Sequence, residues 1–204
     1  MKISLRAAAA VAALALSAPA LAQQQTAQGA HPRVGLGVSM NSSLLGPVVT
    51  LGAADFAPPS NLYVPIYLSP SFRLEPQIGW LSVHDDGSDT TDSAFALGVG
   101  ALFVKPVAAA TNLYGGARLV STWLKDEQRA GTFVERLTRR NTTLAGVFGG
   151  EWLPSAWFSI GIEAQLEFTA IGDPKLRTAA GTATGQGGSA KATEGLLFMR
   201  VYFI

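Results

Sequence analysis

The chain has 204 residues, enough for one domain of ordinary size, and its formal net charge of +1 gives no electrostatic basis for nucleic-acid binding. It contains no cysteine, which excludes disulfides, thiolate chemistry and cysteine-ligated metal sites. Charged residues make up 14% of the chain, against about 25% in an average soluble domain, and glycine is abundant at 22 residues. This composition fits a β-sheet protein with an apolar exterior.

The N-terminus has the organisation of a secretory signal peptide. Lys2 and Arg6 precede the unbroken apolar run 7–16, and the Ala-Leu-Ala of residues 20–22 is a cleavage motif before Gln23. A membrane anchor is the alternative, but this run is shorter than the ~20 residues that a spanning helix needs. We therefore expect three regions: a cleaved signal peptide at 1–22, a flexible lead-in at 23–32 and one domain at 33–204.

From residue 33 onward, apolar side chains alternate with small or polar ones, which is the period of a β-strand. Pro65 weakens one of the strands, because proline cannot donate to a ladder, and the pattern does not decide whether 48–51 extends a neighbour. The alternation predicts eight strands, at 33–41, 62–69, 72–83, 93–104, 113–124, 140–153, 157–170 and 193–204.

The connections between these strands are alternately long and short. The short ones follow the second, fourth and sixth strands, and the long ones include a charged loop at 125–139 and a loop rich in glycine, alanine and threonine at 171–192. This alternation of long and short connections predicts an all-β fold, an eight-stranded antiparallel up-and-down transmembrane β-barrel with short turns at one end and long loops at the other. An even number of strands returns both termini to the same side.

The strand faces opposite the apolar ones carry arginine and glutamate in six of the eight strands, and no lysine lies in a strand interior. An unpaired charge in a confined interior is expensive, so these residues are expected to form an ion-pair network inside the barrel. Arg118 and Arg200 are expected to meet Glu163 or Glu75. The predicted network contains Arg73, Glu75, Arg118, Glu151, Glu163, Glu167 and Arg200. It has two interpretations, a static polar core that sets the strand register and a salt-bridge gate over a narrow conduit.

Aromatic residues on the apolar face lie near both ends of several strands. Their spacing of 8 to 10 residues corresponds to roughly 20–25 Å along a tilted strand, which matches the apolar band of a membrane barrel. The alternative, a soluble lipocalin-like carrier with an apolar interior, gives no reason for two aromatic belts. The predicted lipid-facing girdles contain Phe72, Trp80, Phe95, Phe103, Trp123, Trp152, Phe158, Phe168 and Phe203.

Catalytic and metal-binding motifs are weak in this sequence. His84, next to Ser82 and Asp85, imitates part of a hydrolase site but lies in an acidic segment typical of solvated surface. The aspartates between residues 85 and 92 do not have the spacing of a calcium-binding loop. We expect no catalytic residues, no cofactor and no metal.

The final strand ends the chain with apolar residues at every second position: Leu197, Met199, Val201 and Phe203. A chain that stops on such a strand resembles the bacterial outer-membrane β-barrels, although the last residue here is Ile204 rather than the usual phenylalanine. Together with the signal peptide and the eight alternating strands, it is similar to the small outer-membrane barrels of the OmpA/OmpX type. The resemblance implies the Gram-negative outer membrane after export, insertion by the barrel-assembly machinery, contact with outer-membrane lipid and lipopolysaccharide, and a monomer.

In that setting the charged loop would lie near lipopolysaccharide phosphates, which arginine binds with two donors. The residues expected to contact lipopolysaccharide are Lys125, Arg129, Arg136, Arg139 and Arg140. The expected function is that of a barrel with a charged, largely closed interior and a structural or surface-interaction role. A narrow gated pore for small solutes or ions, and a lipid-modifying outer-membrane enzyme, are the alternatives.

Overall fold

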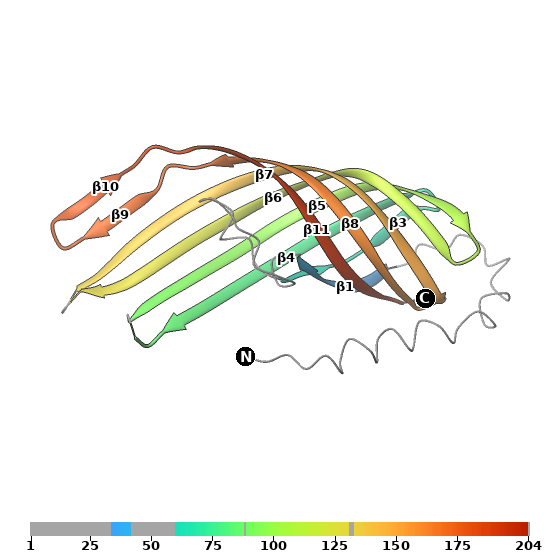
Figure 1. The fold of residues 1–204 in the computed structure, drawn as a ribbon, viewed down its shortest axis with the longest axis horizontal. Coiled ribbons are helices and arrows are strands. Elements are labelled where there is room, and N and C mark those ends of the chain that lie inside the picture. Colours follow the sequence, from blue (N-terminus) through green and yellow to red (C-terminus); the bar gives the residue numbers. More distant parts are fainter. Residues whose placement is uncertain (1–33, 42–59, 88, 131–132, 204) are drawn as a thin grey trace.

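The computed structural model of the protein describes residues 34–41, 60–87, 89–130 and 133–203, and all its regular elements are strands in one antiparallel sheet (Figure 1). The predicted signal peptide, the lead-in, Arg33 and the segment 48–51 lie outside the described residues. The strands are β1 (Val34–Asn41), β2 (Ser60–Tyr63), β3 (Ile66–Ser69), β4 (Phe72–Asp85), β5 (Thr90–Ala108), β6 (Thr111–Ala130), β7 (Phe133–Ser155), β8 (Phe158–Ile171), β9 (Lys175–Thr178), β10 (Gly181–Thr184) and β11 (Gly188–Phe203).

The sheet closes on itself. Each strand from β4 to β8 pairs with the next, β8 pairs with β11, and β11 pairs with β1 from Val34↔Phe203 to Asn41↔Leu196. The strands β2 and β3 both lie between β1 and β4 and complete the ring as its eighth member. The predicted eight-stranded antiparallel up-and-down barrel is therefore confirmed.

The second predicted strand is divided into β2 and β3 at Pro65. Proline has no N–H to donate, so the ladder is interrupted there. The neighbours keep the two pieces aligned, because the Gly35 N–H donates to the Pro65 carbonyl at 2.9 Å and the Val64 N–H donates to the Pro76 carbonyl at 2.9 Å. The chain therefore continues as one member of the barrel.

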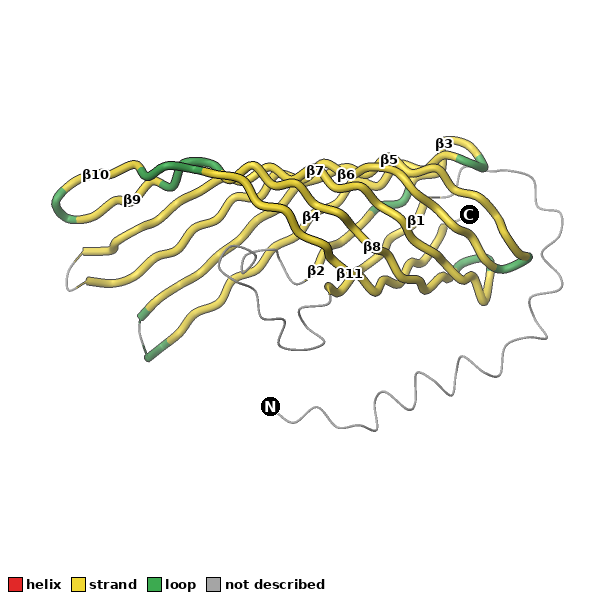
Figure 2. Tube along the Cα trace, turned by 45° about the horizontal axis from the view of Figure 1, so that its top comes forward, coloured by secondary structure: helices red, strands yellow, loops and turns green. Residues whose placement is uncertain are grey.

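The two ends of the barrel differ. The tight connections after Ser69, Ala108 and Ser155 lie at the end where β1 begins and β11 ends, which we call the turn end. At the other, extended end, β6 and β7 project well past the ring and the β9–β10 hairpin lies beside them (Figure 2). The described part of the chain holds no helix with the length and hydropathy of a membrane span.

The prediction of a loop at 125–139 was wrong. The strands β6 and β7 pair without a register shift from Thr111↔Trp152 to Ala130↔Phe133, so most of this charged segment is sheet. Opposite charges across the ladder compensate for the polar sequence, as when the Arg136 Nε donates to the Glu127 Oε1 at 2.7 Å.

The long loop predicted at 171–192 was also wrong in part, because it contains the β9–β10 hairpin and the start of β11. Gly181 opens β10 with φ of 137°, a backbone conformation that glycine alone adopts readily. The strand β9 extends the sheet beside β7, with Leu137↔Leu176 in register. Composition pointed to a loop, whereas pairing with β7 satisfies the backbone groups of this segment.

The two faces of the barrel have opposite polarity. On the outside, Leu119 is 50% exposed, Ile162 68% and Leu166 59%, while on the inside Arg118 is 2% exposed and Glu163 4%. Neighbouring residues of one strand thus alternate between an apolar exterior and a polar interior. The arrangement is the inverse of a soluble barrel, whose apolar residues lie inside.

Candidate functional site

Six charged side chains meet inside the barrel, and none is more than 4% exposed. They come from five strands, so the site exists only when the ring is closed. They are Arg73 and Glu75 on β4, Arg118 on β6, Glu151 on β7, Glu163 on β8 and Arg200 on β11. The three arginines and three glutamates balance each other in charge.

Glu75 is the central carboxylate of this interior network. Its Oε1 lies 2.9 Å from the Arg73 Nε and 2.8 Å from the Arg200 Nη2, and its Oε2 lies 3.0 Å from the Arg118 Nη2. One carboxylate thus contacts all three arginines. Buried charges of this kind are tolerated only because each has several close partners.

The other two carboxylates complete the network. The Glu151 Oε2 accepts hydrogen bonds from Arg73 at 2.8 Å and from Arg200 at 2.7 Å. The Glu163 Oε2 accepts from Arg118 at 3.1 Å. Arg118 therefore reaches both Glu163 and Glu75, while Arg200 reaches Glu75 and Glu151.

All four tyrosines of the chain point into the same interior, a feature that sequence reasoning missed. The Tyr114 hydroxyl donates to the Glu163 Oε2 at 2.9 Å, and the Tyr202 hydroxyl donates to the Glu151 Oε1 at 2.9 Å. The Tyr67 hydroxyl accepts from Arg73 at 2.9 Å, and the Tyr63 hydroxyl accepts from the Ser39 hydroxyl at 2.9 Å. The signal that identifies them is parity, because each lies on the inward face of its strand.

Aromatic rings also cover the arginines directly. The Arg200 Cζ lies 3.8 Å from the centroid of the Phe198 ring, and the Arg118 Cζ lies 4.7 Å from that of Tyr63. Contacts of this type are attractive and strengthen when water is excluded. The guanidinium groups are held both by carboxylates at their edges and by rings at their faces.

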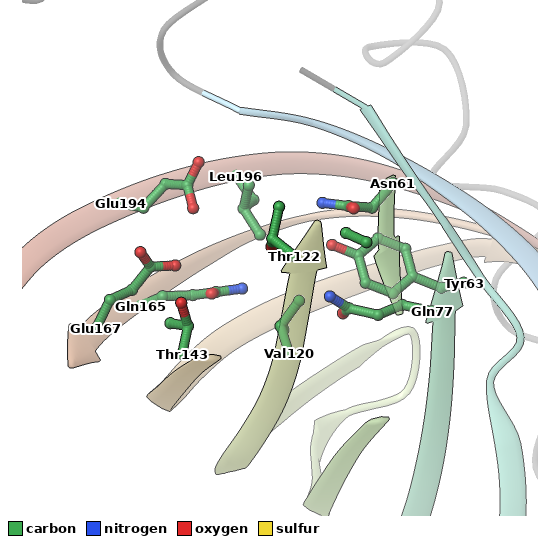
Figure 3. A pocket seen from close by; sticks show the side chains of 11 residues that line it. Asn61, Tyr63, Gln77, Val120, Thr122, Thr143, Gln165, Glu167, Glu194 and Leu196 are labelled. Atoms are coloured by element: carbon green, nitrogen blue, oxygen red, sulfur yellow. The ribbon is translucent and has the colours of Figure 1, made fainter. Parts of the chain in front are cut away.

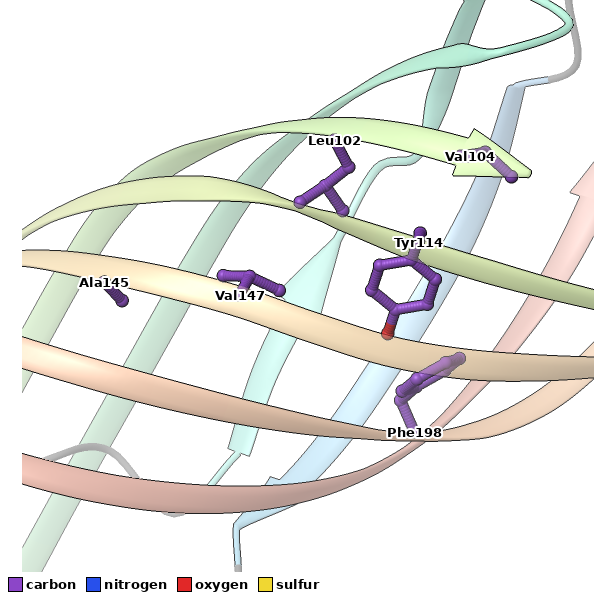
Figure 4. Close-up of a cluster of buried hydrophobic side chains, with 6 residues drawn as sticks. All are labelled: Leu102, Val104, Tyr114, Ala145, Val147 and Phe198. Atoms are coloured by element: carbon purple, nitrogen blue, oxygen red, sulfur yellow. The ribbon is translucent and has the colours of Figure 1, made fainter.

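A cluster of apolar side chains packs in the same interior (Figure 4). Leu102, which is fully buried, lies directly opposite Arg73 in the β4–β5 register. The cluster consists of Leu102, Val104, Tyr114, Ala145, Val147 and Phe198, with Tyr67 packed against it. Apolar packing and the ion pairs together occupy the turn-end half of the interior.

A small polar cavity of about 70 Å³ lies on the extended-end side of the network (Figure 3). Glu167, predicted to join the network, lies instead on the wall of this cavity, which Glu194 also lines. Among the described residues Glu167 forms no ion pair. The other polar residues of the wall are Asn61, Tyr63, Gln77, Thr122, Thr143 and Gln165.

The outward aromatics fall into two levels that the strand register aligns. Near the turn end, Phe72 lies opposite Phe103, with ring centroids 5.4 Å apart. Near the extended end, Phe95 lies opposite both Trp80 and Trp123, and its ring centroid is 5.8 Å from that of Trp123. The remaining residues of the predicted girdles, Trp152, Phe158, Phe168 and Phe203, also lie on the outward face. Trp157, in the turn before β8, is 59% exposed, and its ring centroid lies 6.0 Å from that of Phe158.

The five cations predicted to contact lipopolysaccharide are not all on one face. Lys125, Arg129, Arg136 and Arg140 have the parity of the outward-facing Trp123, whereas Arg139 lies opposite Leu124 on the inward parity. Arg129 forms an ion pair with Asp89, with 3.5 Å between its Nε and the Oδ2.

His84 does not form a hydrolase-like arrangement with Ser82 and Asp85. Its Nδ1 lies 2.9 Å from the Thr91 hydroxyl and its Nε2 lies 3.2 Å from the Asp86 Oδ1, at an exposed position. Among the described residues, no group of three or more histidine, aspartate or glutamate side chains is arranged to hold a metal ion.

No family model and no curated protein matches this sequence. Three solved structures are similar to it in fold. The attachment invasion locus protein Ail of Yersinia pestis is 13% identical, with 85% of this chain and 97% of that chain covered and a TM-score of 0.45. Neisserial surface protein A is 12% identical, with 86% and 100% covered and a TM-score of 0.48.

The N-terminal β-barrel domain of Pseudomonas aeruginosa OprF is 10% identical, with 85% of this chain and 99% of that chain covered and a TM-score of 0.40. All three are outer-membrane β-barrel proteins. Identities this low concern the fold alone, and the assignment of this chain as an eight-stranded antiparallel barrel depends on its own strand pairing.

Proposed function

We propose that this protein is a β-barrel of the bacterial outer membrane with a closed interior, and that it acts as a structural or surface-interacting element rather than as an enzyme. The observation that carries the proposal is the inverted polarity of the barrel. Large apolar side chains cover the outside, and the buried charges meet in the centre. In water, a continuous apolar surface of this kind would favour aggregation, whereas in lipid it is the stable arrangement.

A soluble carrier is disfavoured by the same observation. Its ligand would need an apolar cavity. The interior instead holds ion pairs, tyrosines and a cavity of only about 70 Å³, which is lined largely by polar residues. Cell fractionation separates the two functions. The full chain, expressed with its N-terminal segment in a Gram-negative host, is expected in the outer-membrane fraction with a heat-dependent shift in gel mobility. Recovery in the soluble periplasmic fraction would contradict the proposal.

The closed interior is supported by the density of contacts around Glu75 and by the apolar cluster beside it. The polar cavity next to the network favours one second candidate, a narrow pore whose ion pairs rearrange to open. Planar-bilayer recordings decide between them. A closed barrel is silent at every voltage, whereas a gated pore conducts and its conductance changes in Arg118→Ala.

The absence of catalysis is tested separately. The protein is incubated with outer-membrane lipids, and the lipid masses are measured before and after. We expect no change in mass for the wild type. A change that is lost in His84→Ala would replace the structural role with a lipid-modifying one.

A further inference from the structure

The polar cavity beside the interior network has a wall whose charges are all of one sign (Figure 3). Two carboxylates belong to it, those of Glu167 on β8 and Glu194 on β11, whereas none of its described residues is a lysine, arginine or histidine. The other polar groups of the wall are amides and hydroxyls. The oxygen atoms of these groups are of the kind that binds hard cations.

The two carboxylates are diagonal neighbours across the β8–β11 ladder. Glu194 lies opposite Gln165, and Glu167 lies two residues further along β8, opposite Ala192. Diagonal neighbours are about 7–8 Å apart, which is within the reach of long side chains. Both glutamates are half-buried and lie on the same side of the cavity in Figure 3. Two carboxylates placed in this way repel each other unless a proton or a cation lies between them.

The nearby arginine is held by other carboxylates. Arg118 reaches the wall of the cavity, because its Nη1 donates to the Gln77 Oε1 at 2.7 Å. Its Nη2 lies 3.0 Å from a Glu75 oxygen and 3.1 Å from a Glu163 oxygen. The three arginines and three glutamates of the network balance each other, so the two carboxylates of the wall leave this part of the interior negatively charged.

Gln165 is a second and independent indication of a ligand. It lines the cavity from β8 and is only 5% exposed. Its Nε2 donates to the Glu163 Oε1 at 2.5 Å, and since a carboxylate only accepts, the carbonyl oxygen of the amide faces away from Glu163. Among the described residues, no side chain donates to that oxygen. A water molecule would satisfy the oxygen, but it would not neutralise the two carboxylates beside it.

We propose that this cavity binds a divalent cation of the calcium class, held by Glu167, Glu194 and the Gln165 carbonyl oxygen, with water completing the shell. Calcium accepts about six to eight oxygen ligands in flexible geometry, whereas magnesium requires a regular octahedron and releases its water reluctantly. A cavity of about 70 Å³ has room for an ion and a few water molecules. The charge of the ion would equal that of the two carboxylates.

The bound ion would have a structural consequence. It would join β8 to β11, the strand that closes the ring by pairing with β1. A ligand that binds only the folded state stabilises that state, so calcium would strengthen the closed ring. The inference goes beyond the proposed function, because it requires the closed ring but not a location in the outer membrane.

The test is a calorimetric titration of calcium chloride into the full-length chain, refolded in detergent and freed of metal with a chelator. The cavity variant, Glu167→Gln/Glu194→Gln, keeps the size of both side chains and removes both charges. The control, Asp92→Asn/Asp126→Asn, removes two carboxylates that also face each other but lie outside the cavity. Each protein must show the heat-dependent gel shift of the wild type. If the double variant does not fold, the single variant Glu167→Gln takes its place.

We expect the cavity variant to bind calcium about tenfold or more weakly than the wild type, because calcium affinity depends on the number of charged ligands. The control is expected to stay within about twofold, since its site is separate. Magnesium chloride should bind the wild type about tenfold or more weakly than calcium chloride. Calcium should also raise the urea midpoint of the wild type and of the control, but not that of the cavity variant.

Any of four results would overturn the proposal. A wild type that gives neither calcium binding nor a calcium-dependent urea midpoint would mean that the two carboxyls share a proton instead. Equal calcium binding by the cavity variant would remove the ion from the cavity, and loss of binding in the control would place it at the outer aspartates. Equal affinity for magnesium and calcium would indicate attraction by charge alone. With a normal gel shift, each of these results leaves the proposed membrane barrel intact, whereas a wild type without the shift would refute the barrel itself.

Discussion

The Oε1 of Glu75 on β4 and the Nη2 of Arg200 on β11 lie 2.8 Å apart although their strands are not neighbours in the sheet. The contact crosses the interior of the barrel and ties together members that the backbone ladder does not join directly. Arg73 and Arg118 converge on the same carboxylate. Glu75 thus makes the closed ring a single packed unit.

Removal of this carboxylate should be strongly destabilising. In Glu75→Gln, three buried arginines would share two carboxylates, and breaking a buried pair in this way costs about 3–5 kcal/mol. Urea unfolding in lipid vesicles, followed by tryptophan fluorescence, measures the loss. Glu127→Gln is the matched control, because Glu127 also holds two cations but on the surface, and its loss should be about 0.2–1 kcal/mol. Equal losses in the two variants would mean that the interior network contributes no special stability.

The cost of placing an arginine on the exterior should depend on its depth in the lipid-facing band. Leu119 lies opposite Val99, midway between Phe95 and Phe103, so Leu119→Arg is expected to destabilise the folded barrel in vesicles by about 2–4 kcal/mol. Val134, on the same outward face but beyond the aromatic level near the extended end, is the control, and Val134→Arg should change stability by about 0–1 kcal/mol. A soluble barrel would tolerate both, since Leu119 is 50% exposed and Val134 42%.

An interior glycine leaves space for a neighbouring tyrosine ring, so its substitution should lower the stability of the barrel. A Cβ at Gly149 would collide with the Tyr114 ring and hydroxyl and lie 2.8 Å from the Ile162 carbonyl oxygen, so Gly149→Ala is expected to destabilise by about 1–3 kcal/mol. Gly146, three residues earlier on β7, has the outward parity of Phe148, and a Cβ there would have no neighbouring atom within 4 Å, so Gly146→Ala should be within about 0.5 kcal/mol of the wild type. Urea midpoints that fall equally in both variants would contradict this account.

The extended end should respond to pH through two neighbouring carboxyls with opposite signs. Partial burial raises the pKa of Asp126 above its ordinary value of 3.8, and Asp92, directly opposite on β5, raises it further. Hydrogen bonds from Lys125 and Arg136 lower the pKa of Glu127 below 4.5. The stabilisation that Asp126 contributes to the free energy of unfolding is therefore fully present below pH 3.8 and is lost as the pH rises through its raised pKa. The stabilisation that Glu127 contributes is lost as the pH falls below 4.5.

On lowering the pH from about 7.5 to about 4.5, the lower limit above which Glu127 keeps its contribution, we expect the backbone amides of 124–128 to gain protection against hydrogen exchange, after correction for intrinsic rates. The amides of 113–120, inside the ring, serve as the internal reference. Asp126→Asn should abolish the gain. A gain that persists in this variant would assign the pH response to another group.

The sequence by itself determined the eight members of the ring, their two faces and the order in which they close. Alternation with period two is local, so it marks Leu119 as outward and Arg118 as inward without any knowledge of partners. It also contained the parity of all four tyrosines, although their hydroxyl contacts with the network do not follow from parity alone.

Only the tertiary structure decided which charges meet and where the strands end. The contacts of Glu75 with Arg118 and Arg200 cross the interior, and such pairs depend on the stagger of the closed ring, which no single strand encodes. Likewise, the charged segment 125–139 becomes strand because its partner supplies opposite charges and ladder bonds, as Glu127 and Arg136 do. The position of Arg177 opposite Arg136 follows from the register of β9 on β7, a long-range pairing that composition cannot specify.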